Sequence, residues 1–255
     1  MMQTAPRHLN LNDRPSLAFV ASAGREPTVL FLTGFRSDMT GAKALRLEQH
    51  CARRGQAFLR FDYRGHGASA GHFEDGCIGD WRDDALAIID AATDGPLVLV
   101  GSSMGGWIML LVARQRPERV AGLVGIAAAP DFTHDLILPQ LTQSHRAALD
   151  RNGMFPAPSA YGEPTPITRR LLEEGERNLV LQASLRLRCP VHLLHGQQDP
   201  DVPWQTSLRL AACLESGAVT VELIKDGDHR LSREEDLRRI EAALDRVIEQ
   251  ALGRA

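Results

Sequence analysis

The sequence of 255 residues has only four cysteines, and they stand far apart. No two of them form a Cys-x-x-Cys pair, which argues against a zinc site and against a disulfide framework. A cysteine–histidine protease is also poorly supported, because no cysteine sits in an obvious turn between a strand-like and a helix-like run. We therefore expect four reduced, separately packed thiols, at Cys51, Cys77, Cys189 and Cys213.

The sequence also lacks an excess of charge of either sign. Its 29 lysines and arginines nearly balance 32 aspartates and glutamates, which gives no electrostatic reason to expect nucleic acid or an anionic membrane as a partner. No apolar run approaches the roughly 20 residues of a membrane-spanning helix, and the first residues contain no apolar segment typical of a secretory signal. We therefore predict no stable membrane insertion and a cytoplasmic location.

Motifs for metals and nucleotides are missing as well. The scattered histidines show no metal-ligand spacing with one another. The phosphate loop Gly-x-x-x-x-Gly-Lys-[Ser/Thr] is absent, and no Gly-x-Gly-x-x-Gly opens a helix. The sequence therefore predicts neither a metal nor a cofactor.

The sequence instead alternates short apolar runs with longer amphipathic ones. Short buried strands between helices are typical of an α/β protein, whose mostly parallel central sheet is flanked by helices on both faces. The run 17–22 is expected to pair as an antiparallel edge strand. Other predicted strands cover 27–33, 57–62, 96–101, 120–127, 190–195 and 219–224, and predicted helices cover 42–54, 80–92, 104–114, 204–214 and 234–252.

One region breaks this alternation. Between residues 131 and 185 no strand pattern stands out, five prolines occur, and helices are predicted at 140–151 and 167–180. An interruption of this length is usually functional or disordered, and its scattered apolar residues argue against disorder. We predict a core formed by residues 1–130 and 186–255, with a cap inserted at 131–185.

The stretch GSSMGG at 101–106 lies between a strand-like and a helix-like run. With Ser103 at its centre it matches Gly-x-Ser-x-Gly, the sharp strand-to-helix turn that holds a nucleophilic serine above a sheet. Glycine is needed at positions 101 and 105, because side chains there would collide with the neighbouring strand or helix. Ser102 has no such flanking glycines and is interpreted as a small residue that fills the turn.

A serine nucleophile requires a base, and the base requires an orienting acid. Asp199 follows the predicted strand 190–195, and His229 lies in the loop before the last helix. Taken alone, Asp199 is explained as a turn former and His229 as an exposed loop histidine. Because acid and base follow the serine in the order expected for this fold, the three together predict a catalytic triad. Asp201 and Asp228 are the alternative acids.

An oxyanion hole needs two backbone N–H donors. One is expected from Met104, directly after the nucleophile, and the other from Phe35, in the loop after the first long strand. His66 and Trp107 are candidate neighbours of the substrate, although Trp107 is expected to pack against the sheet. His192 and His195 are expected to pack or hydrogen-bond within a strand. Apolar cap residues suit an acyl chain, although packing within the cap explains them equally well: Met154, Phe155 and Tyr161.

Several stretches resemble α/β-hydrolases over nearly the whole chain. They resemble most the mitochondrial α/β-hydrolase-domain esterases that act as acyl-protein thioesterases and mycophenolic acid acyl-glucuronide esterases. The stretches are FLTGFRSDMTGAKAL, RFDYRGHGAS, GDWRDDALAIID, DGPLVLVGSSMGGWIML, LLHGQQDPDVPWQTS and DGDHRLS.

The resemblance implies an α/β-hydrolase fold, with a mostly parallel sheet and an inserted cap, and the triad Ser103, Asp199 and His229. It implies small acyl esters or S-acylated peptides and proteins as substrates. The familiar His-Gly before the oxyanion residue is Thr33–Gly34 here, and the branch likewise lacks that histidine. Since no clear import signal is present, we expect a bacterial-type relative.

The leading hypothesis is a serine hydrolase that cleaves carboxylic esters or thioesters through an acyl-enzyme. A C–C bond hydrolase or a peroxidase-type relative would use the same triad and stays open as the alternative. Dehalogenase and epoxide-hydrolase chemistry is disfavoured, because it places a carboxylate where Ser103 stands. A binding module without catalysis is the third hypothesis, although it has no need for an intact triad.

Overall fold

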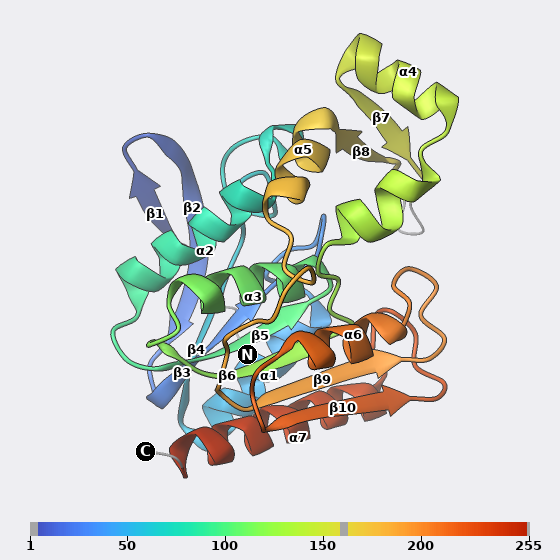
Figure 1. Ribbon diagram of the computed structural model, residues 1–255. Helices are drawn as coiled ribbons and strands as arrows, with labels where there is room; N and C mark the ends of the chain where they lie inside the picture. The colour runs from blue at the N-terminus through green and yellow to red at the C-terminus, as the bar shows by residue number, and fades with distance from the viewer. Residues whose placement is uncertain (1–4, 159–162, 254–255) are drawn as a thin grey trace.

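The computed structural model describes residues 5–158 and 163–253. Its centre is an eight-stranded sheet in the order β1-β2-β4-β3-β5-β6-β9-β10 (Figure 1). The pairs β1–β2 and β2–β4 are antiparallel, and all other neighbours in this sheet are parallel. The strands are β1 (Arg7–Leu11), β2 (Arg14–Ser22), β3 (Arg25–Leu32), β4 (Gln56–Phe61), β5 (Leu97–Ser102), β6 (Val120–Ile126), β9 (Val191–Gly196) and β10 (Val219–Ile224).

The antiparallel end of the sheet differs from the sequence prediction. The run 17–22 falls within β2, which is antiparallel as expected, but β1 lies outside it and forms the edge. The prediction of an edge strand at 17–22 was therefore wrong. The segment of β1, RHLNL, is largely exposed and has no apolar run, so hydrophobic periodicity gives no signal for it.

Helices cover both faces of the sheet (Figure 1). Successive residues of β5 point to opposite faces: Val98 and Val100 join the core under α1 and α7, whereas Leu97 and Leu99 join the core under α2 and α3. This burial on both faces explains why the central strands read as continuous apolar runs. The helices are α1 (Ala42–Arg54), the 3₁₀ helix η1 (Phe73–Asp75), α2 (Ile78–Ala92), α3 (Met104–Gln115), α6 (Gln205–Cys213) and α7 (Glu234–Leu252).

A separate group of elements is inserted between β6 and β9. Its hairpin and α4 project from the body of the molecule, while α5 returns toward α2 (Figure 1). Both ends of the insertion are fastened together, because the buried Asp131 carboxylate accepts the backbone N–H groups of Val180 (2.9 Å) and Leu181 (2.8 Å). The elements are η2 (Thr133–Ile137), η3 (Leu138–Gln140), α4 (Gln143–Asn152), β7 (Met154–Ala157), β8 (Thr165–Thr168) and α5 (Arg169–Arg177).

The hairpin β7–β8 corrects the prediction that this region contains no strand. Pro156 and Pro166 stand opposite each other in its antiparallel register. Proline lacks a backbone N–H and is therefore confined to strand edges. In a sheet of two strands each strand is an edge, so the prolines that argued against strands are compatible with this small sheet.

Candidate active site

The candidate nucleophile Ser103 lies in a sharp turn between β5 and α3. Its backbone has φ 54° and ψ −120°, a region that residues other than glycine rarely adopt. The turn is fixed by hydrogen bonds from the Ser103 N–H to the Ile126 carbonyl and from the Ala129 N–H to the Ser103 carbonyl, both 3.0 Å. The end of β6 and the loop that follows it thus hold the strained residue at the carboxyl end of β5.

Two glycines permit this turn. A Cβ on Gly105 would collide with the backbone carbonyl oxygens of Leu32 and Thr33, at the end of β3. A Cβ on Gly101 would collide with the Gly105 carbonyl. Backbone atoms cannot rotate away as a side chain does. The first turn of α3 therefore approaches β3 this closely only without a side chain at Gly105, and approaches β5 this closely only without one at Gly101.

Ser103, His229 and Asp199 form one continuous line of hydrogen bonds. His229 Nδ1 lies 2.7 Å from Asp199 Oδ2, and His229 Nε2 lies 3.0 Å from Ser103 Oγ. An ionised carboxylate only accepts, so Nδ1 carries the proton and Nε2 is free to accept the serine proton. The three residues come from the ends of β5, β9 and β10, which meet at the carboxyl edge of the parallel sheet.

The Asp199 carboxylate is enclosed and fully paired. Oδ1 accepts the backbone N–H groups of Asp201 and Val202, both at 2.8 Å, and Oδ2 also accepts from His195 Nε2 at 3.1 Å. Burial raises the pKa of Asp199, but the hydrogen bonds from His195 and His229 outweigh burial and hold its pKa well below the usual range. The carboxylate therefore stays charged and can stabilise an imidazolium at His229.

The geometry also separates Asp199 from the alternative acids. Asp201 is exposed and donates its own N–H to Asp199. Asp228 accepts the backbone N–H of Leu231 at 2.9 Å. Asp199, Asp201 and His229 have candidate ligand atoms within 4.8 Å of one another, but His229 and Asp199 are hydrogen-bonded to each other. A metal-free site stays the prediction.

His195 is a member of this site whose role the sequence did not reveal. Its side chain is fully buried, and its Nδ1 lies 2.7 Å from Ser207 Oγ on α6. Its Nε2 faces two acceptors, Asp199 Oδ2 and the Val202 carbonyl, so Nε2 carries the proton. His195 was expected to pack or hydrogen-bond in its strand. The structure adds that its hydrogen-bond partner is the candidate acid, Asp199.

The loop after β3 brings Phe35 to the nucleophile. A Cβ on the preceding Gly34 would lie 3.4 Å from the Ser103 Cβ, so the loop backbone passes directly beside Ser103. The Phe35 ring packs in a group of aromatic side chains, with centroids 4.9 Å from Phe73 and 5.5 Å from Phe132. Met104 opens α3 on the other side of Ser103.

The residues predicted to line a substrate pocket differ in how far they are buried. Trp107 has no exposed surface and its Nε1–H donates to the Asn178 carbonyl at 3.0 Å, while His66 is 4 % exposed and uses both ring nitrogens. Neighbouring side chains enclose both residues, which agrees with the expected packing of Trp107. That either residue lines a substrate pocket stays a prediction. Phe155 is buried against His145, Met154 is 40 % exposed, and Tyr161 lies outside the described residues.

Comparisons with known proteins agree with this architecture. Residues 27–157 match the family model described as alpha/beta hydrolase fold. The human palmitoyl-protein thioesterase ABHD10, mitochondrial, is 38 % identical over 250 residues, which cover 97 % of this chain and 81 % of that protein. The mouse protein of the same name is 39 % identical over 246 residues, covering 95 % and 82 % of the two chains.

Solved structures show the same similarity in three dimensions. A putative hydrolase from Agrobacterium vitis S4 has a TM-score of 0.92 with 43 % identity and covers 95 % of this chain and 98 % of its own. Alpha/beta hydrolase domain-containing protein 10 from mouse has a TM-score of 0.89 with 37 % identity, covering 96 % and 99 %. The resemblance and the fold predicted from the sequence motifs are confirmed. The chain belongs to the α/β-hydrolase family, in the branch of the ABHD10 proteins.

Proposed function

We propose that this protein is a serine hydrolase that cleaves carboxylic esters and thioesters through an acyl-enzyme. The observation that carries the proposal is the continuous line of hydrogen bonds from Asp199 through His229 to Ser103. Serine alone is a weak nucleophile, and this arrangement supplies the base that removes its proton. The family membership supports the same chemistry.

In the first half of the reaction Ser103 Oγ attacks the acyl carbonyl while His229 Nε2 takes its proton. Asp199 stabilises the resulting imidazolium without itself being protonated. The backbone N–H groups of Phe35 and Met104 are the proposed donors to the oxyanion of the tetrahedral intermediate. His229 then returns the proton to the leaving alcohol or thiol, and the acyl group stays on Ser103.

In the second half a water molecule replaces the leaving group. His229 takes a proton from the water as it attacks the acyl carbon, and Ser103 Oγ leaves with that proton. The products are a carboxylic acid and the free enzyme. Ser103 and His229 are partly exposed, and 13 % of the His229 side chain is open to solvent, so water can reach the base.

The inserted segment at 131–185 is the proposed cap. It begins at the carboxyl end of β6, beside the strand that carries Ser103, and its Phe132 contacts the ring of Phe35. The Arg36 guanidinium also donates to the Pro164 carbonyl at 3.0 Å. These contacts support the proposal that the cap borders the oxyanion loop and the entrance for an acyl group.

We propose S-acylated peptides or proteins as the substrate class, with activated acyl esters as a second class. This choice is supported by the ABHD10 relatives, which are named palmitoyl-protein thioesterases. Among the described residues no helix is both long and apolar enough to cross a membrane. The cytoplasmic location stays a prediction, since the relatives carry the word mitochondrial in their names.

A chain-length series tests the proposed function. Thioesters and oxyesters that share the same acyl groups, from acetyl to palmitoyl, are compared for kcat/KM with wild-type protein and with Ser103→Ala. We expect wild-type turnover that rises with acyl length and is greater for the thioester of each pair. A flat profile that favours acetyl oxyesters would contradict the thioesterase assignment, and turnover by Ser103→Ala would contradict the nucleophile.

A further inference from the structure

The residue after Phe35 has an unusual backbone. The Ser37 N–H donates to the Gly34 carbonyl at 3.1 Å, which closes a four-residue turn, and Arg36 in its third position has φ 54°. A positive φ at the third position alone defines a type II turn, which normally requires glycine there. Type I, the commoner turn, differs by a flip of the peptide between Phe35 and Arg36. Something must therefore hold this peptide in the less favoured orientation.

His66 contacts that peptide directly. Its Nε2 accepts the Arg36 N–H at 3.3 Å, and its Nδ1 lies 3.1 Å from the Arg64 carbonyl. Since a carbonyl only accepts, Nδ1 carries the proton and Nε2 is left as an acceptor. Burial lowers the pKa of His66 to about 4, so the ring is neutral at neutral pH. A protonated Nε2 would face the Arg36 N–H as a second donor.

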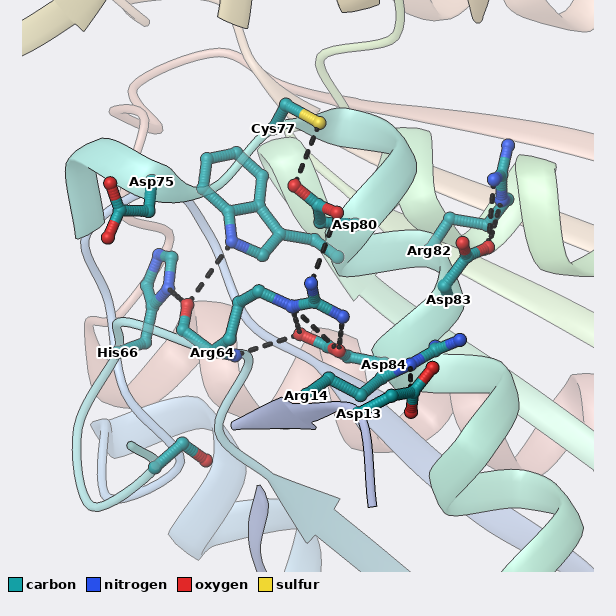
Figure 2. Close-up of polar contacts among 12 residues, drawn as sticks. Asp13, Arg14, Arg64, His66, Asp75, Cys77, Asp80, Arg82, Asp83 and Asp84 are labelled. Carbon is teal, nitrogen blue, oxygen red and sulfur yellow. Dashed lines mark hydrogen bonds and ion pairs between the residues drawn. The ribbon is translucent and has the colours of Figure 1, made fainter. Parts of the chain in front are cut away.

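Arg64, whose carbonyl accepts the His66 Nδ1–H, is itself held in position by several hydrogen bonds. Figure 2 shows the His66 ring pointing at the Arg64 carbonyl, while the Arg64 guanidinium lies against Asp84 on α2. The fully buried Asp84 carboxylate accepts from the Arg64 backbone N–H at 2.9 Å and from its guanidinium at 2.6 Å. Asp80 binds the same guanidinium at 3.1 Å, and Trp81 Nε1–H also donates to the Arg64 carbonyl. Helix α2 therefore fixes the position of the His66 ring.

We propose that His66 is a positioning residue for the oxyanion hole: its neutral Nε2 holds the Phe35–Arg36 peptide and thereby fixes the turn from Gly34 to Ser37. The neighbouring Gly34–Phe35 peptide of this turn carries the Phe35 N–H beside Ser103. This inference rests on the proposed function, because it assigns the Phe35 N–H to the oxyanion. His66 touches no substrate in this account. Its effect passes through one backbone hydrogen bond and through the turn that this bond selects.

Three substitutions at His66 separate its two hydrogen bonds. Phenylalanine keeps a ring among Tyr63, Phe73 and Trp81 but removes both bonds. Asparagine has an amide that reaches the Arg64 carbonyl but is too short for Arg36. Glutamine carries an acceptor at the distance of Nε2.

The control is His192→Phe, since His192 is a buried histidine on β9 that bonds Glu222, away from the proposed site. For each folded variant, kcat and KM are measured with p-nitrophenyl octanoate, and the melting temperature reports folding.

We expect His66→Phe and His66→Asn to lower kcat about 10- to 100-fold, since small displacements of an oxyanion donor have effects of this size. KM should stay within about threefold of wild type, because the lost interaction forms only in the transition state. His66→Gln should recover part of kcat, and His192→Phe should keep wild-type kcat.

An unchanged kcat in folded His66→Asn would overturn the proposal, as would a loss seen only in KM. A glutamine variant no better than asparagine would overturn it too, because the acceptor would then be irrelevant. Wild-type turnover and labelling of Ser103 by a fluorophosphonate are recorded alongside. If the wild type shows neither, the proposed function itself fails; if it shows both and the His66 variants match it, only this inference fails.

Discussion

His229 Nε2 lies 3.0 Å from Ser103 Oγ, although 126 positions separate the two residues along the chain. The sheet order explains the contact. Strands β5, β6, β9 and β10 are consecutive neighbours and run parallel, so their carboxyl ends and the loops that follow share one edge. A loop residue after β10 can therefore reach back across the edge to a residue after β5.

Asp199→Asn should lower kcat by about 10⁴-fold with the fold intact. The backbone N–H groups of Asp201 and Val202 require an oxygen at the Oδ1 position, so the asparagine oxygen should turn toward them. Its NH₂ group then faces His229 Nδ1, which must give up its proton. The proton moves to Nε2, and Nε2 can no longer accept from Ser103. Steady-state kinetics with an aryl ester measure the loss.

Asp201→Asn is the matched control for that variant. Its side chain is exposed and the backbone N–H that supports Asp199 is kept, so kcat should stay close to wild type. If Asp201→Asn instead lost most of its activity and Asp199→Asn kept it, Asp201 would be the acid.

Gly105→Ala should lower the free energy of unfolding by about 3 kcal/mol, the upper range for overpacking a core. The new methyl group would collide with the carbonyls of Leu32 and Thr33, and these are backbone atoms of β3. Gly217→Ala is the control, because a Cβ there meets nothing within 4 Å. Urea denaturation compares the two. Equal stabilities would mean that the approach of α3 to β3 does not require glycine.

Acidification should destabilise the native state partly through His66. Burial lowers the pKa of His66 to about 4, whereas histidine in an unfolded chain has a pKa of about 6.5. Between these values the unfolded chain binds the proton and the native state does not, so the free energy of unfolding falls as the pH falls. The full shift corresponds to about 3 kcal/mol.

Urea denaturation at about pH 7 and about pH 4.5 measures this effect. His66→Phe should lose less stability on acidification than wild type, by about 2 to 3 kcal/mol. The exposed His8→Gln should follow the wild type. An identical acid dependence in His66→Phe and wild type would mean that the buried ring does not resist protonation.

Much of this architecture was predictable because the central strands are buried on both faces and read as apolar runs. The turn at Ser103 was predictable because its two glycines and its serine lie within five consecutive residues. Asp199 and His229 followed from their place after strand-like runs. In each case the signal lies within a few residues, where periodicity and turn chemistry operate.

The features that the sequence did not reveal depend on distant contacts or on weak local patterns. The bond from Arg36 to His66 joins loops 30 positions apart, and nothing near either residue marks it. Arg36 has a positive φ although it is not a glycine, so the residue type does not indicate this conformation. The prolines of the hairpin β7–β8 argued against a strand there. The role of His195 depends on the loop after β9, which folds back so that Asp199 contacts His195.

Covalent labelling by a fluorophosphonate tests the central claim most directly. The reagent reacts with a serine only when a base and an oxyanion hole activate it. We expect intact-protein mass spectrometry to show one adduct, peptide mapping to place it on Ser103, and both to be lost in Ser103→Ala. Folded wild-type protein that stays unlabelled, or a label that persists in Ser103→Ala, would contradict the account.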